Sequence, residues 1–145
     1  MFRGALAIAL IGFAIPIALA QSDPIAARQA LMKANGRQAK LGSDMVRGKV
    51  PFDLAKAKAV FDSFIEAANK MPNLFPEDSK AGHDTSASPE IWTHLEDLKA
   101  RFAQLGADAK TAQDATKDLQ SFRAGYRKIS EECDSCHERY RLKNS

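Results

Sequence analysis

The sequence is poor in the residues that build metal clusters and disulfide networks. Its 145 residues include two cysteines, three histidines and one tryptophan. A structural zinc site usually takes four protein ligands, and no second cysteine pair is present to complete one. No stretch reads as β-strand, which argues against a thioredoxin-type redox pair because that motif accompanies a βαβ pattern. No internal repeat or low-complexity tract is found, so the composition predicts an ordinary globular chain.

A strong charge of one sign is also missing. The chain has 21 basic and 18 acidic side chains, for a net charge of +3. No basic stripe with interleaved aromatic residues is present, so we expect no nucleic-acid binding. Beyond residue 20, no apolar run is long enough to span a bilayer. The mature protein is therefore expected not to be embedded in a membrane.

Residues 1–20 have the pattern of a signal peptide. Arg3 is followed by an uncharged apolar stretch and then by Ala18-Leu19-Ala20, a small-x-small cleavage site. We predict cleavage before Gln21 and export to the periplasm, with a retained membrane anchor as the alternative. Residues 21–145 then form one domain with one core.

The segment from Cys133 to His137 has the sequence Cys-x-x-Cys-His, which is the attachment motif of a c-type haem. Two thiols at this spacing can each add to one haem vinyl group, and the histidine after them can bind the iron as the proximal ligand. On a helix, Cys133, Cys136 and His137 are related as i, i+3 and i+4 and share one face. We predict one covalently bound haem c. A disulfide is the alternative, but it leaves His137 unexplained.

Apolar residues recur at helical spacing in four segments. The first runs from Ile25 to about Val46 after a Ser22-Asp23-Pro24 start, and the second runs from an Asp53 cap to Pro72. After a loop over residues 73–87, the third starts at Ser88-Pro89, a weak break falls at 107–114, and the fourth reaches Tyr140. The pattern predicts an all-α fold, an antiparallel four-helix bundle with haem c attached near the C-terminal helix. Cys133 continues the apolar stripe of the last helix, so the haem is expected to lie against the core.

The second axial ligand of the iron decides the chemistry. The other methionines and histidines beyond the signal segment are the candidates: Met32, Met45, Met71, His83 and His94. A methionine on an apolar stripe is more often core filler than a ligand. Met32 is favoured because Arg28 lies one turn earlier on the same face and Gly36, one turn later, leaves room for a haem edge. Spacing alone leaves ligation by Met32 undecided.

These residues carry a resemblance over essentially the whole mature chain. The matching segments are Leu31-Met32-Lys33, Asn35-Gly36, Gly48-Lys49-Val50-Pro51-Phe52-Asp53, Pro72-Asn73-Leu74-Phe75-Pro76, Ser88-Pro89, Ile91-Trp92, and the Cys133–His137 motif followed by Tyr140-Arg141. The chain resembles a class II cytochrome c of the cytochrome c′ family, and is most similar to its low-spin, methionine-ligated cytochrome c-556 branch.

The resemblance implies a role for each site residue. Cys133 and Cys136 would be the thioether attachment points, His137 the proximal ligand and Met32 the distal ligand. In high-spin relatives, the residue at the Met32 position only crowds an empty sixth site, where carbon monoxide or nitric oxide binds. By the same analogy Arg28 and Arg141 lie near the haem pocket, with ordinary surface charge as the alternative for both.

We therefore expect an electron carrier and not an enzyme. Its partners would be redox proteins, and the sequence leaves monomer and homodimer open. Arg139, Arg141 and Lys143 could steer an acidic partner to the haem, but Glu131, Glu132 and Glu138 lie among them. The favoured interpretation of this region is a solvated face of mixed charge. The competing function is a five-coordinate protein that binds nitric oxide or carbon monoxide.

Overall fold

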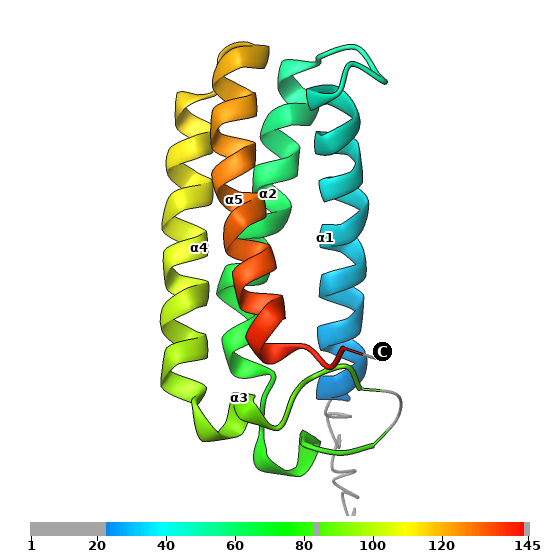
Figure 1. Ribbon diagram of the computed structural model, residues 1–145, viewed down its shortest axis with the longest axis vertical. Coiled ribbons are helices and arrows are strands. Elements are labelled where there is room, and N and C mark those ends of the chain that lie inside the picture. The colour runs from blue at the N-terminus through cyan, green and yellow to red at the C-terminus, as the bar shows by residue number, and fades with distance from the viewer. Residues whose placement is uncertain (1–22, 83–84, 144–145) are drawn as a thin grey trace, which may run out of the picture.

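Four long helices form an antiparallel bundle in the computed structural model, which describes residues 23–82 and 85–143 (Figure 1). They are α1 (Pro24–Val46), α2 (Leu54–Lys70), α4 (Leu95–Ala115) and α5 (Leu119–Tyr140). Helix α1 packs on α2, α2 on α4, and α4 on α5. The predicted four-helix bundle is confirmed. The predicted signal peptide lies outside the described residues.

Side-chain caps fix where the long helices begin. Asp23 accepts a hydrogen bond from the backbone N–H of Ile25 at 2.9 Å, and Asp53 accepts one from Lys56 at 2.9 Å. Asp118 and Ser121 cap each other's backbone at the start of α5. Such caps satisfy backbone donors that have no partner inside the helix. The helix starts expected at Asp23-Pro24 and Asp53 are confirmed.

The third helical segment differs from the expectation. No break occurs at residues 107–114, because α4 continues to Ala115. The alanines there are the best helix formers, Ala109 and Ala112 are buried, and Lys110 pairs with Asp114 one turn later. The interruption comes earlier, at His94 (φ −128°, ψ 40°), and separates the short helix α3 (Glu90–Thr93) from α4.

The connection between α2 and α3 folds back under one end of the bundle. It contains two 3₁₀ turns, η1 (Met71–Asn73) and η2 (Glu77–Ser79). The segment before α3 pairs with the chain after α5 through a single antiparallel bridge between Ala87 and Arg141. Apart from this bridge, the described residues contain no β-strand. This pairing closes the same end of the bundle at which α5 ends (Figure 1).

At the opposite end, α1 and α5 touch. A Cβ added to Gly42 would lie 2.5 Å from the Tyr126 ring, so only glycine permits this approach. The Tyr126 hydroxyl donates to the Ala39 carbonyl at 2.6 Å. Beneath it, the rings of Phe61 and Phe122 pack edge to face with centroids 5.5 Å apart. We call this end, which is built around Phe61, Phe122 and Tyr126, the closed half.

Candidate haem site

Two adjoining cavities occupy the other end, which we call the open half. Their volumes are about 470 and 410 Å³, and the larger lies between the first half of α1 and the last turns of α5. Six residues line both cavities and mark their junction: Met32, Asn35, Phe102, Cys133, Cys136 and His137. The fold therefore brings the attachment motif and Met32 to one place from opposite ends of the chain.

The two cysteines present free thiols from α5. Both are half-buried and neither forms a disulfide. Burial raises the pKa of Cys133 to about 11 and also raises the pKa of Cys136. At neutral pH both thiols are protonated, which does not favour a thiolate metal site. Within residues 23–82 and 85–143, no group of three or more His, Cys, Asp or Glu side chains could hold a metal ion. The disulfide and zinc alternatives therefore gain no support.

His137 follows the cysteines on the same helix face and opens into both cavities. Desolvation lowers its pKa, and the positive charge of Arg141 lowers it further. The residue is exposed where it lines the cavities, and the lowered pKa favours the neutral imidazole at neutral pH. Neutral imidazole is the form that binds a metal. Arg141 lines the larger cavity but is exposed, so its role in the haem pocket stays a prediction.

Met32 is the candidate distal ligand that the structure places at the junction. Met45 is 1% exposed in the core of the closed half and lines neither cavity. Met71 lines only the larger one. His94 is on the surface, with Nε2 3.3 Å from a Glu90 carboxylate oxygen, and His83 lies outside the described residues. Among the described candidates, Met32 alone shares both cavities with His137.

Arg28 is not a surface charge. Its side chain is 5% exposed, and its guanidinium lies over the rings of Phe75 and Trp92, 4.9 and 5.7 Å from their centroids. It donates to the Leu74 carbonyl at 2.5 Å and to the Ser79 hydroxyl and carbonyl at 2.8 and 3.1 Å. Burial lowers the pKa of Arg28, and the charge of Asp23 opposes that shift. Arg28 ties α1 to the connection that lines the larger cavity.

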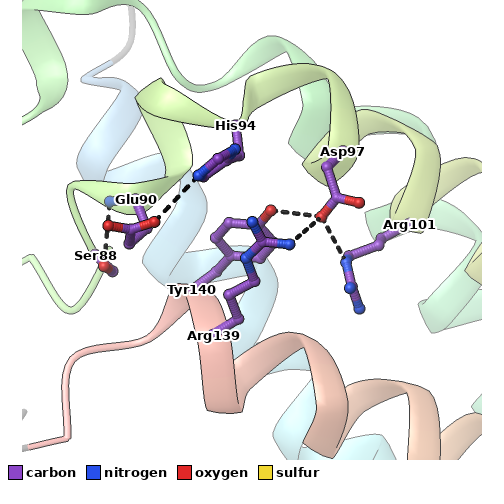
Figure 2. A network of polar contacts seen from close by, with 7 residues as sticks. All are labelled: Ser88, Glu90, His94, Asp97, Arg101, Arg139 and Tyr140. Atoms are coloured by element: carbon purple, nitrogen blue, oxygen red, sulfur yellow. Dashed lines mark hydrogen bonds and ion pairs between the residues drawn. The ribbon is translucent and has the colours of Figure 1, made fainter.

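A polar network fixes the end of α5 against α4 (Figure 2). Asp97 accepts from the Tyr140 hydroxyl at 2.5 Å, from Arg101 Nε at 2.8 Å and from an Arg139 nitrogen at 3.2 Å. These donors, Tyr140 first, lower the pKa of Asp97. The Tyr140 backbone carbonyl also accepts from Ser88 at 2.9 Å. The last turn of α5, which carries His137, is thereby held in place. The sequence did not reveal this network because Arg139 and Tyr140 lie 42 and 43 residues from Asp97.

Glu132 also departs from the expected solvated face. It is half-buried, lines the smaller cavity, and its Oε2 has no hydrogen-bond partner among the described residues. Burial, followed by the neighbouring Asp108 carboxylate, raises the pKa of Glu132 to about 7. Asp108 is held by Gln104 Nε2 at 2.6 Å and Lys128 Nζ at 2.7 Å. Next to Cys133, the chain therefore carries a carboxyl group that is half protonated near neutrality.

Comparison with known proteins now decides the family. The family described as Cytochrome C′ matches residues 23–141. The chain belongs to the cytochrome c′ family. Cytochrome c′ of Rhodopseudomonas palustris is 38% identical over 128 residues, which is 88% of each chain. Cytochrome c-556 of the same organism is 31% identical over 129 residues, 86% of this chain and 87% of the relative. The predicted class is confirmed.

Solved structures agree with the fold. The structure of cytochrome c′ from Rhodopseudomonas palustris superposes with a TM-score of 0.82 at 38% identity, covering 86% of this chain and all of that one. The oxidised cytochrome c556 of R. palustris gives a TM-score of 0.79 at 30% identity, with the same coverage. Proteins of both names thus match this cytochrome c′ family member over the same span.

The cofactor follows from the family and fits the site. This cytochrome c′ family member carries one covalently bound haem c, attached near the C-terminal helix. Both cavities are within the size range of cofactor sites, and the larger one is lined mostly by apolar side chains, such as Phe102 and Leu98. The two thiols and the imidazole point into them from one helix. Among the described helices, none has the length and apolar character needed to cross a membrane.

Proposed function

We propose that the protein is an exported electron carrier whose haem iron is bound by His137 and Met32 from opposite sides. Cys133 and Cys136 form the thioether links. The observation that carries the proposal is the position of Met32, which faces the same two cavities as His137 from a different helix. Two axial side chains on separate, well-anchored helices suit a site that stays six-coordinate.

The bound haem supplies a one-electron couple between ferric and ferrous iron. A thioether opposite an imidazole favours the ferrous state and raises the potential. The chain's part is to hold both side chains in place and to keep water out. Phe102 and Leu98 line the apolar wall, and the Tyr140–Asp97 contact anchors the last turn of α5. Little rearrangement is then needed when an electron enters or leaves.

The surroundings of the site fit electron exchange with other proteins in the periplasm. Lys128 and Arg101 line the smaller cavity together with Glu131, so its mouth carries mixed charge. Such a surface suits short-lived contacts with redox partners, as monomer or homodimer. The named relatives are cytochromes, which supports electron transfer over catalysis as the role.

A second function has one observation in its favour. The relative named cytochrome c′ is 38% identical and the relative named cytochrome c-556 from the same organism is 31% identical. A five-coordinate iron that binds nitric oxide or carbon monoxide beside an unligated Met32 is therefore the competing proposal.

Absorption spectra of the purified holoprotein, with and without carbon monoxide, separate the two functions. We expect a low-spin spectrum with a methionine–iron charge-transfer band in the ferric state and slow, incomplete carbon monoxide binding in the ferrous state. Met32→Leu should convert the protein to a high-spin form that binds carbon monoxide readily. Met71→Leu is the matched control, because Met71 lines only the larger cavity and should leave the spectrum unchanged. A high-spin wild-type spectrum would overturn the electron-carrier proposal.

A further inference from the structure

Asn35 is the one polar residue at the junction of the two cavities that the proposed function leaves without a role. Of the six residues that line both cavities, four are the proposed haem attachment points and ligands, and Phe102 is an apolar wall. Asn35 lies on α1, three residues after Met32, so their side chains leave the same helix face.

Asparagine is a poor choice for this position unless its side chain has a partner. It is less favourable than alanine inside a helix, and an amide beside an apolar cavity costs free energy when its donors stay unpaired. Asn35 is half-buried, and its amide has a side-chain partner on one end only. Ser63 Oγ on α2 donates to Asn35 Oδ1 at 2.7 Å, and no described residue accepts from Asn35 Nδ2.

The contact with Ser63 occupies the amide oxygen of Asn35. The amide nitrogen, with its two N–H donors, is the end of the side chain that is open to a second partner. Helix α1 therefore presents a thioether and, one turn later, an amide donor to the same space. A thioether sulfur is a weak hydrogen-bond acceptor.

We propose that Asn35 is a positioning residue for Met32: held by Ser63, its amide donates a hydrogen bond to the Met32 sulfur and fixes the orientation of the thioether. This inference rests on the proposed function, because it assigns the group that holds the distal ligand. The hydrogen bond draws electron density from the sulfur, so it also favours the ferrous state.

The test measures the apparent affinity of the reduced holoprotein for carbon monoxide, which competes with Met32, together with the midpoint potential. Loss of a hydrogen bond of ordinary strength in Asn35→Leu should raise the carbon monoxide affinity by about fivefold and lower the potential. Ser63→Ala keeps the Asn35 amide but removes the contact that orients it. The carbon monoxide affinity should therefore rise by a smaller factor, about twofold.

Gln38→Leu is the matched control. Gln38 is on the same helix, one turn beyond Asn35, and lines neither cavity. Its substitution should change neither quantity. The side-chain amide protons of Asn35 in the reduced protein should in addition exchange more slowly with solvent than those of the exposed Gln120, which gives a readout independent of ligand binding.

The outcomes separate this inference from the proposed function. A low-spin wild type in which Asn35→Leu leaves both quantities unchanged overturns the role of Asn35 and leaves the electron carrier intact. A high-spin wild type overturns both, since no ligated thioether is then present to be positioned. If Asn35→Leu does not fold, Ser63→Ala decides: an affinity and potential equal to the wild type contradict the inference.

Discussion

The two ends of the bundle use the same four helices in opposite ways. In the closed half, α1 and α5 meet at Gly42 and Tyr126, and the aromatic rings of Phe61 and Phe122 fill the space between the helices. In the open half, the same two helices carry Met32 and His137 across two cavities. The closed half is packed throughout by side chains. The open half has a second core cluster around Leu98 and Phe102, and the two cavities beside it are where the haem would be held.

Removal of the haem should have the largest effect on the difference between the two halves. In a Cys133→Ser, Cys136→Ser double variant, the open half should lose amide hydrogen-exchange protection by roughly 100-fold, while the helices of the closed half stay protected. Exchange measured by mass spectrometry resolves the two ends. Ser135→Ala, an exposed residue between the cysteines, is the control and should keep its haem. A uniform loss over both ends would contradict the division into halves.

The reverse experiment damages the closed half. Phe122 is fully buried, and Phe122→Ala should lower the free energy of unfolding of the holoprotein by about 3–5 kcal/mol. The visible spectrum should stay the same, because Phe122 lines neither cavity. Urea unfolding and absorption spectra measure the two effects. A spectral change at full folding would show that the halves are not independent.

Arg28→Lys should weaken only the part of the open half in which the connection after α2 is tied to α1. A lysine keeps the charge but cannot reach Leu74 and Ser79 together, as the planar guanidinium does. We expect a loss of about 2 kcal/mol in unfolding free energy and faster amide exchange over residues 74–82. Lys56→Arg, on the exposed face of α2, is the matched control, because it also replaces one cationic side chain with another. Unchanged exchange in this segment would refute the role of Arg28.

Glu132 gives the smallest effect, and it depends on pH. Its folded-state pKa of about 7 lies above the unfolded value, so the native state holds the proton longer and stability falls as pH rises from about 4.5 to 7. Glu132→Gln removes this loss and should stabilise the protein at pH 8 by about 1 kcal/mol. This value is reduced because the side chain is partly exposed to solvent. At pH 4 the substitution should have almost no effect. Glu131→Gln, on the exposed neighbour, is the matched control for the loss of one carboxylate. Thermal unfolding at the two pH values measures both, and equal effects at pH 4 and pH 8 would contradict the shift.

Local patterns explain what could be predicted from the sequence. The attachment motif depends on three positions of one helix, and the bundle follows from apolar periodicity, so both could be read directly. The position of Met32 opposite His137 followed from the first helix and the family resemblance. Its ligation of the iron stays a prediction.

What the sequence did not reveal depends on distant contacts. Arg28 looks like a surface charge until the irregular connection after α2 folds over it and supplies Leu74 and Ser79 as acceptors. Glu132 lies in a run of charged residues, and its burial, together with the approach of Asp108 on α4, distinguishes it from the exposed Glu131. The expected break at 107–114 was wrong because buried Ala109 and Ala112 pack as core residues despite their small size.

The walls of the haem site come from opposite ends of the chain, and this has a consequence for unfolding. With Met32 bound to an iron that is itself fixed to α5, the distal bond would act as a reversible cross-link closing a loop of about 100 residues. In the chain-entropy account, a permanent link of that length restricts the unfolded chain by about 4–5 kcal/mol. A thioether binds ferrous iron more firmly than ferric iron. The resistance of the protein to denaturants would then rise and fall with the electron it carries.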